Sequence, residues 1–510
     1  MELSTKSVHT SRNVYQLYLW LAVGVLLAAL SSGRWYFPLG AWLAPVFFLY
    51  FLRGYPHLWR GYGVVVLASL VVMTGAWWGV FPVSFGAGIV LMSGVVSSIP
   101  YLVDRWLSPR LGGFAATLVF PLFATAWEFV NMAGSPLGSF GATAYSQVGF
   151  LPLLQIVSIT GMWSITFLMA WFASMAAWAW EENFRWTPIR RGVLLYAAIL
   201  ALVLFFGAVR LTTAAPAQTF VTVAGITPEP VRPLFGQVLG AADGNQPETQ
   251  ATLTALYDAY FTATRAEAEA GAQIVLWPEG AALGYGEGEA ALVERAKATA
   301  RAEGIYLGLP LFTAYPGQAR PGENRLLLID PKGEVALEHV KFGGNFLEGS
   351  LLGDKVLRTT ETPFGTLAGV ICWDLDFVVE MRQAGRAGVD LLLVPSNDWQ
   401  EITPFHGRMA ILRAIENGVG IVRQTDHGLS IAIDSYGRTL AEMDHFSAAE
   451  RRMVVQMPVG HVKTLYPVIG DIFGWLAVAG FMALGAVTAI TQRTNAIQRR
   501  FSPIPAAVVQ

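Results

Sequence analysis

The sequence predicts a helical membrane domain into which one α/β domain is inserted, and three observations support this fold class. Hydrophobic residues make up 54% of the 510 residues and charged residues only 14%, whereas soluble proteins carry roughly 45–50% and about 25%. Long apolar runs fill the chain up to about Arg210 and return near residues 472–490. Between these regions, strand-like and helix-like stretches alternate, which is typical of an α/β domain.

The apolar runs predict membrane spans, because about 20 apolar residues cross roughly 30 Å of hydrocarbon. We expect spans at residues 14–31, 36–52, 62–81, 85–103, 112–131, 152–180, 190–209 and 472–490. Lys and Arg near span ends stay on the cytoplasmic side. If the N-terminus is inside, most basic residues fall in inside segments, and the outside stretches 82–84 and 132–151 contain none. The segment after the seventh span then lies outside the cytoplasm.

These spans divide the chain into three predicted regions. Residues 1–212 form a membrane domain of about seven transmembrane helices, and residues 213–466 form an extracytoplasmic catalytic domain. Residues 467–510 form a C-terminal transmembrane helix and a basic cytoplasmic tail. The net charge of −2 is close to neutral and the basic residues are not clustered, so nucleic acid is not an expected partner. A single cysteine provides neither a disulfide framework nor a zinc site.

That cysteine, Cys372, is the first candidate functional residue. It ends the apolar run AGVIC, and a lone cysteine is most often a small buried apolar side chain. In an extracytoplasmic domain, however, an unpaired thiol is a candidate reactive group. Glu279 follows the run IVLWP, and Lys341 follows LEHV. Thiol chemistry needs a base and a cation that stabilises the oxyanion, and these are the roles that Glu279 and Lys341 could fill.

The motifs WPEG, HVKFGGNFLEGS and GVICWD occur in this order and resemble the three motifs of the nitrilase, or carbon–nitrogen hydrolase, superfamily. The resemblance implies a Glu–Lys–Cys triad at the strand ends of an α-β-β-α sandwich. The flanking spans, together with SNDW, RMAILRAIENG and TLYPVIGDIFGWL, narrow the resemblance to the apolipoprotein N-acyltransferase family. The expected fold is therefore an α/β nitrilase-like α-β-β-α sandwich domain inserted in a polytopic α-helical membrane domain.

The resemblance also implies a two-step acyl transfer by an N-acyltransferase. Cys372 would accept a fatty acyl chain from a membrane phospholipid, and the amine of a diacylglyceryl-cysteine apolipoprotein would then take it from the thioester. Glu279 would be the base, and Lys341 would stabilise both oxyanions. Glu348, Trp373 and Asn397 are expected to support the site. Phospholipid, apolipoprotein and the lipid bilayer are the implied partners, with no metal and no cofactor, and the implied location is a bacterial inner membrane.

A rival interpretation is a membrane-anchored amidase or nitrilase-type hydrolase, in which water replaces the amine. It needs the same triad, so the sequence does not separate the two. A binding or transport protein with an inactive outer domain is disfavoured because Glu279, Lys341 and Cys372 are all present. Cys372 is followed by Trp373 and Asp374, where the acyltransferases commonly have Tyr and Glu, so the acyl acceptor is less well determined than the nucleophile.

Other polar residues carry weaker expectations. Glu128 lies within or beside a span, where a carboxylate is costly and is usually paired or functional. His406 and His427 show no second ligand at metal spacing and are expected to be ordinary loop or core residues. The segment EITPFHG, residues 401–407, is expected to form a loop beside the site. Residues 127–150 are rich in aromatic and small residues and could line a path for lipid, or form an interfacial aromatic belt.

Overall fold

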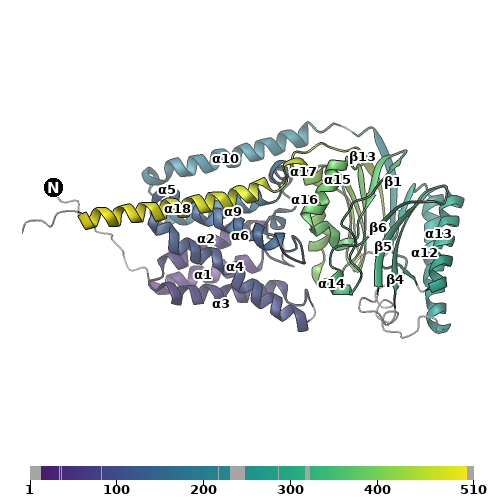
Figure 1. Ribbon diagram of the computed structural model, residues 1–510, viewed down its shortest axis with the longest axis horizontal. Helices are drawn as coiled ribbons and strands as arrows, with labels where there is room; N and C mark the ends of the chain where they lie inside the picture. Colours follow the sequence, from purple (N-terminus) through teal and green to yellow (C-terminus); the bar gives the residue numbers. More distant parts are fainter. Residues whose placement is uncertain are drawn as a thin grey trace, which may run out of the picture. The chain divides into compact units, whose positions relative to one another are not determined.

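The structure is a computed structural model that describes residues 13–501, except for residues 34, 36, 82, 216, 230–246, 285 and 316–321. Its contacts divide the chain into two compact units (Figure 1). The helical unit contains the chain up to Phe129, Thr166–Leu200, and the chain from Ile472 onward. The α/β unit contains Val130–Ile165 and Ala201–Asp471. Each unit is built from segments that lie far apart in the sequence.

The helical unit has the apolar helices of a multi-pass membrane protein. Helices lying wholly or partly in it are α1 (Val14–Ala29), α2 (Pro38–Gly54), α3 (Leu58–Trp77), α4 (Val83–Leu111), α5 (Gly113–Ala116), α6 (Val119–Ala133), α9 (Trp163–Glu181), α10 (Trp186–Thr212) and α18 (Ile472–Phe501). Among the described residues, five stretches are long and apolar enough to cross a membrane by length and composition: Leu58–Trp77, Gly86–Leu111, Gly113–Ala133, Trp186–Thr212 and Ile472–Thr494. Helices α1 and α2 are apolar but shorter.

Glu128 belongs to α6 in the helical unit. The Thr166 hydroxyl on α9 donates a hydrogen bond of 2.5 Å to Glu128 Oε2. This contact reduces the cost of placing a carboxylate in an apolar helix. The expectation that Glu128 has a partner is therefore confirmed.

The predicted span at residues 152–180 is wrong in its first part. Here the chain forms two single turns, α7 (Leu151–Leu154) and α8 (Val157–Thr160), before α9 begins. Gly161 has a φ of +65°, which interrupts a right-handed helix. A Cβ at this position would lie 2.4 Å from a ring carbon of Tyr466, so only glycine fits. Both turns belong to the α/β unit, and the compact units therefore divide the chain differently from the predicted boundary at residue 212.

Two β-sheets form the centre of the α/β unit. The strands are β1 (Thr219–Ile226), β2 (Ile274–Leu276), β3 (Ala282–Gly284), β4 (Tyr306–Ala314), β5 (Gly322–Ile329), β6 (Val335–Val340), β7 (Thr359–Thr362), β8 (Gly365–Gly369), β9 (Leu391–Asn397), β10 (Gly420–Asp426), β11 (Leu429–Ile433), β12 (Thr439–Asp444) and β13 (Arg452–Val459). In the described part of the chain, the first sheet has the order β13-β1-β2-β4-β5-β6, with β3 beside β4. The second sheet has the order β12-β11-β10-β9-β8-β7.

The two sheets pack face to face and are covered by helices on their outer faces. Buried apolar side chains of both sheets, including Val223, Leu276, Leu393 and Val422, form one shared core. Helices α12 (Pro247–Glu269) and α13 (Gly286–Glu303) lie on the outer face of the first sheet, and α15 (Val378–Ala387) and α16 (Phe405–Asn417) lie beside the second (Figure 1). The predicted α-β-β-α sandwich is confirmed.

Strands β8, β9 and β10 run parallel and bring their carboxyl ends to one edge of the second sheet. The runs LLLVPSN and GIVRQTD are buried almost throughout, as expected for parallel strands covered on both faces. The short elements η2 (Cys372–Asp376) and η3 (Gln400–Ile402) follow β8 and β9, and α14 (Asn345–Glu348) follows β6. The unit also contains η1 (Thr143–Gln147) and α17 (Tyr466–Ile469). Among the candidate site residues, Cys372 and Asn397 lie at the carboxyl ends of β8 and β9, whereas Glu279 and Lys341 follow β2 and β6 of the first sheet.

Candidate active site

Three strands position the predicted triad. Glu279 lies three residues after the end of β2, Lys341 directly follows β6, and Cys372 lies three residues after the end of β8. All three residues are buried, with 5%, 4% and 3% of their surface exposed. Burying charged side chains costs free energy unless they are paired. Buried Glu279 and Lys341 therefore require partners.

Lys341 and Glu279 form a buried ion pair. Lys341 Nζ donates to Glu279 Oε1 at 2.6 Å and to Glu348 Oε2 at 2.9 Å. Asn324 on β5 donates from Nδ2 to Glu279 Oε1 at 2.8 Å and to Glu348 Oε1 at 3.2 Å. The Ser350 hydroxyl donates to Glu348 Oε1 at 2.6 Å. The Lys341 ammonium therefore binds the carboxylates of both Glu279 and Glu348. The Glu348 carboxylate is also held by Ser350, through its other oxygen.

The pKa values of this pair follow from burial and from these partners. Burial raises the pKa of Glu279, and the charge of Glu348 raises it further, against the opposing effect of Lys341. For Lys341, burial alone would lower the pKa, but the two carboxylates outweigh it and the pKa lies well above 10.5. Lys341 therefore stays an ammonium group, while Glu279 is more basic than an exposed glutamate. This combination suits a cation that holds an oxyanion beside a general base.

Cys372 occupies a strained turn that is fixed by Asp374. Its φ of +47° lies in the left-handed region, which residues other than glycine rarely adopt. Asp374 Oδ1 accepts hydrogen bonds from the backbone N–H of Phe342 at 2.9 Å and of Gly343 at 2.6 Å. Asp374 Oδ2 accepts one from the backbone N–H of Ile371 at 2.9 Å. Asp374 thus ties the cysteine turn to the segment that follows the lysine strand.

The thiol of Cys372 lies among polar groups. Its Sγ is 3.9 Å from the Asn397 carbonyl oxygen, 4.0 Å from Asp398 Oδ1 and 3.9 Å from Arg423 Nη2. Burial raises the pKa of Cys372 well above 9.0, and the charge of Glu279 adds to this effect. The resting group is therefore a neutral thiol, which requires a base to become a nucleophile.

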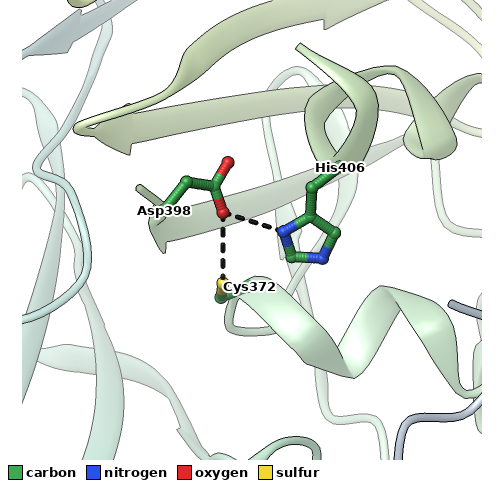
Figure 2. A group of neighbouring side chains, drawn as sticks. All are labelled: Cys372, Asp398 and His406. Carbon is green, nitrogen blue, oxygen red and sulfur yellow. Dashed lines mark hydrogen bonds and ion pairs between the residues drawn. The ribbon is translucent and has the colours of Figure 1, made fainter. Parts of the chain in front are cut away.

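Beside the thiol lies a buried charge network that the sequence reasoning missed. His406 Nδ1 is 2.8 Å from Asp398 Oδ1, and His406 Nε2 is 2.9 Å from Asp376 Oδ2. Arg423 donates to both oxygens of Asp398, at 2.9 and 2.8 Å. Figure 2 shows one Asp398 oxygen facing both the thiol of Cys372 and the His406 ring. His406 is a buried residue of the core, but the expectation that it has no second ligand at metal spacing is wrong, because donor atoms of Cys372 and Asp398 lie within 4.8 Å.

Charge pairing explains why this network is stable when buried. Burial alone would lower the pKa of His406, but Asp398 and Asp376 outweigh it and raise the pKa. Arg423 and His406 hold the pKa of Asp398 well below its ordinary value, although burial acts in the opposite direction. The available sequence signals were the acidic residues of CWDLD and SND, which follow two parallel strands and so meet at one sheet edge.

The remaining predicted site residues also lie here. Asn397 Nδ2 donates to the Glu279 carbonyl oxygen at 3.4 Å. Trp373 Nε1 donates to the Leu137 carbonyl oxygen at 3.1 Å, and its ring lies 4.8 Å from the Phe140 ring. The segment 130–165 therefore contacts the residue that follows Cys372. The structure brings the predicted triad and its predicted supporting residues into one cluster.

The predicted loop at residues 401–407 is wrong at its carboxyl end. Helix α16 begins at Phe405, and both Phe405 and His406 are buried. The ring of Phe405 lies 5.6 Å from that of Phe140, and His406 is held by two aspartates. The Pro and Gly of this segment indicated a loop in the sequence. Aromatic packing and charge pairing instead hold residues 405 and 406 in the first turn of α16.

Two groups of described side chains have the donor atoms and spacing of metal ligands. In each, the donor atoms lie within 4.8 Å of one another: Cys372, Asp398 and His406 in the first, and Asp426, His427 and His445 in the second. In the first group the guanidinium of Arg423 already occupies both oxygens of Asp398, so a metal ion would face an adjacent cation. The second group contradicts the expectation that His427 has no second ligand at metal spacing.

Comparison with known protein families agrees with this fold. Residues 238–456 match the carbon–nitrogen hydrolase family. The chain is 27% identical to the apolipoprotein N-acyltransferase of Geobacter metallireducens, over 83% of this chain and 84% of that protein. It is 26% identical to the apolipoprotein N-acyltransferase of Bradyrhizobium diazoefficiens, over 80% and 78%. The crystal structure of an amidase from Nesterenkonia sp. is 21% identical, with a TM-score of 0.37, and covers 48% of this chain and 92% of that one.

The sandwich and the match at residues 238–456 define the class of this part of the chain: it is a carbon–nitrogen hydrolase, or nitrilase-like, α/β domain. The described residues also contain five apolar stretches long enough to cross a membrane. Within that class, the chain as a whole is similar to the apolipoprotein N-acyltransferases, and this similarity extends beyond the sandwich into the helical unit.

Proposed function

We propose that the protein transfers a fatty acyl chain from a membrane phospholipid, through a thioester on Cys372, to the α-amine of a diacylglyceryl-cysteine apolipoprotein. The observation that carries the proposal is the ion pair of Lys341 and Glu279, buried at 2.6 Å, since the charges of both residues act on the buried thiol of Cys372. The similarity to apolipoprotein N-acyltransferases over most of the chain supports the choice of substrates.

In the first step, Glu279 takes the proton from the Cys372 thiol, and Sγ attacks the ester carbonyl carbon of the phospholipid. The negative charge that forms on the carbonyl oxygen is stabilised by the Lys341 ammonium. The tetrahedral intermediate then collapses: the C–O ester bond breaks, the proton on Glu279 passes to the leaving oxygen, and lysophospholipid departs. The acyl chain remains on Cys372 as a thioester.

In the second step, the lipoprotein amine attacks the thioester carbonyl carbon. Glu279 takes a proton from the amine, and Lys341 again faces the oxyanion. The C–S bond breaks as the amide forms, and the sulfur regains a proton from Glu279. A carboxylate with a raised pKa suits this role. Glu279 must accept a proton from the thiol or the amine and then return it to the leaving oxygen or the sulfur.

The surroundings of the thiol support a lipid substrate. The aromatic rings of Trp373 and Phe140 lie 4.8 Å apart, and Trp399 stacks on Trp373 at 6.3 Å. Trp373 and Phe140 are buried, and an acyl chain that packs against these rings would gain about 0.8 kcal/mol for each CH₂ group buried. The membrane helices support the same choice, since both proposed substrates carry lipid chains that are costly to move into water.

The positive-inside pattern supports an extracytoplasmic α/β unit in a bacterial inner membrane. Because Cys372 is the only cysteine and is buried, single added cysteines can map this topology. Ser447, exposed in the α/β unit, and Arg185, exposed between α9 and α10, are suitable positions. In intact spheroplasts, a membrane-impermeant maleimide should label Ser447→Cys and leave Arg185→Cys unlabelled. The reverse labelling would reject this orientation.

The activity is tested with the purified full-length protein in detergent micelles, given phospholipid and a synthetic diacylated lipopeptide. The proposal predicts that mass spectrometry detects N-acylated lipopeptide and lysophospholipid in equal amounts. Release of free fatty acid without N-acylated lipopeptide would instead favour the membrane-anchored hydrolase. Cys372→Ala is the control, and it should form neither product.

A further inference from the structure

A second polar cluster, formed by Asp426, His427 and His445, takes no part in the chemistry proposed above. Asp426 is the last residue of β10, His427 follows it, and His445 follows β12. Asp426 Oδ1 lies 2.9 Å from His427 Nδ1 and 3.4 Å from His445 Nδ1. The two imidazole rings are stacked, with centroids 4.4 Å apart and planes 23° from parallel.

His445 is the residue in this cluster that indicates a missing partner. It is 5% exposed, and its Nδ1 atom is buried and makes no hydrogen bond. The contact of this atom with Asp426 Oδ1 has the distance of an ion pair but not the geometry of a hydrogen bond. A buried imidazole nitrogen without a hydrogen bond carries a desolvation cost of about 1–3 kcal/mol. A metal ion bonded to this nitrogen would remove that cost.

The spacing of the donor atoms suits a small tetrahedral ion. With metal–ligand bonds of about 2.0–2.1 Å, neighbouring ligands of a tetrahedral zinc ion lie roughly 3.3 Å apart. The separations of Asp426 Oδ1 from the two imidazole Nδ1 atoms, 2.9 and 3.4 Å, bracket this value. Two imidazoles and one carboxylate favour Zn²⁺ over Mg²⁺ or Ca²⁺, which prefer oxygen ligands. The His427 side chain is 22% exposed, so water can reach the fourth position.

The charges around the cluster are compatible with a bound cation. Asp426 supplies one negative charge, and a metal-bound imidazole must be neutral.

We propose that Asp426, His427 and His445 bind one Zn²⁺ ion, with water as the fourth ligand. The ion would join the turn after β10 to the end of β12, where the His445 N–H already donates to the Gly428 carbonyl oxygen at 3.0 Å. It would also brace the nucleophile's surroundings, because the Asp426 carbonyl oxygen accepts a 3.0 Å hydrogen bond from the N–H of Asp398. The site is structural, and it is separate from the proposed acyl transfer.

The test uses full-length protein without a histidine tag, purified in detergent and stripped with a chelator. Zn²⁺ binding is measured by competition with a chromogenic chelator, and Co²⁺ is added to a second sample. We expect one equivalent of Zn²⁺ per chain, the visible absorption of tetrahedral Co²⁺, and a higher unfolding temperature with Zn²⁺ than without. Absence of stoichiometric binding would overturn the proposal, whether or not the protein transfers acyl chains.

Variants identify the ligands. His427→Ala and His445→Ala should each weaken Zn²⁺ binding at least tenfold and remove the rise in unfolding temperature. His461→Ala is the matched control, because His461 is another partly buried histidine outside both ligand groups. Cys372→Ala should also keep full binding, which excludes the group at the nucleophile. His427 is partly exposed, so its variant should fold even if His445→Ala does not. Undiminished binding in His427→Ala would reject the assignment.

Discussion

Lys341 Nζ lies 2.6 Å from Glu279 Oε1, and neither side chain has more than 7% of its surface exposed. Because the pair is buried, each partner depends on the other: removing one leaves an uncompensated charge in a region of low dielectric. The two residues come from different strands of the first sheet. Their contact therefore links the folding of the sandwich to the chemistry of the site.

Lys341→Met should lower the rate of thioester formation by about 10²–10³-fold, because the oxyanion loses the cation that faces it. The same change should reduce the free energy of unfolding by about 3–5 kcal/mol, since Glu279 is left buried and unpaired by a cation. Single-turnover acylation and thermal unfolding measure the two effects. Lys297→Met is the control: Lys297 pairs with the exposed Glu294 and should cost no more than about 1 kcal/mol. Equal effects of both variants would contradict the assigned role.

The pH dependence of thioester formation should report Glu279. The base acts as a carboxylate, so the rate rises as pH increases through its pKa. Burial raises that pKa above the ordinary value of 4.5, and the acid limb of the rate profile should therefore lie above pH 4.5. Single-turnover rates measured across the acid range test this. An acid limb at or below the ordinary value would contradict the proposed base.

Glu348→Gln should move that acid limb to lower pH. The negative charge of Glu348 is one cause of the raised pKa of Glu279, and the amide removes this charge while keeping the shape of the side chain. Glu361→Gln, at an exposed position on β7, is the control and should leave the limb in place. If the acid limb of the rate profile also stays at the same pH in Glu348→Gln, the charge of Glu348 does not raise the pKa of Glu279 in solution.

His406 should make the stability of the α/β unit depend on pH. Its pKa is raised in the folded protein by Asp398 and Asp376, so the protonated ring stabilises the fold. This contribution is complete below the ordinary value of 6.5 and is lost as pH rises through the higher folded pKa. His406→Gln should remove this pH dependence and cost about 3–5 kcal/mol at acid pH, because the buried Asp376 loses its charged partner, whereas Asp398 keeps Arg423.

Unfolding measured from acid to alkaline pH compares His406→Gln with the parent protein. His57→Gln, at an exposed position before α3, should keep the parent profile. A His406→Gln profile parallel to that of the parent would show that the ring is not protonated in the folded state.

Gly138 tests whether the segment 130–165 is fixed against the catalytic strands. Its φ is +59°, and a Cβ here would lie 2.5 Å from the Asp376 carbonyl oxygen. Gly138→Ala should therefore destabilise the unit by more than about 1 kcal/mol and slow acylation. Gly134→Ala is the matched control in the same segment, because its Cβ would meet nothing within 4 Å. Equal stability of the two variants would mean that the segment does not pack in this way.

Much of the sandwich could be predicted from the sequence, because its signals are local. The runs AQIVLWPEG and VDLLLVPSND are apolar, short and bounded by turn residues, and each contains a strand ending before a polar residue. The strand ends therefore indicated Glu279, Lys341 and Cys372 as candidate site residues, and Asn397 was added by the family resemblance. Family resemblance then supplied the pairing of Glu279 with Lys341, residues that lie far apart in the sequence.

The features that the sequence did not predict depend on contacts between segments far apart in the chain, which no local pattern encodes. Pro404 and Gly407 lie on either side of His406 and indicated a loop. Its partners Asp376 and Asp398 come from other segments and allow the charged ring to be buried. The run at 152–180 has the composition of a span, but the close approach of Tyr466 to Gly161 depends on tertiary packing. For the same reason, the membership of residues 130–165 in the α/β unit followed only from the structure.

The most direct test is the intact mass of the full-length protein after incubation with phospholipid and no acceptor. We predict an increase by one acyl chain that is absent in Cys372→Ser and disappears when the diacylated lipopeptide is added, as N-acylated lipopeptide forms. Formation of N-acylated lipopeptide by Cys372→Ser, or a mass increase that persists in that variant, would contradict the central role of this thiol.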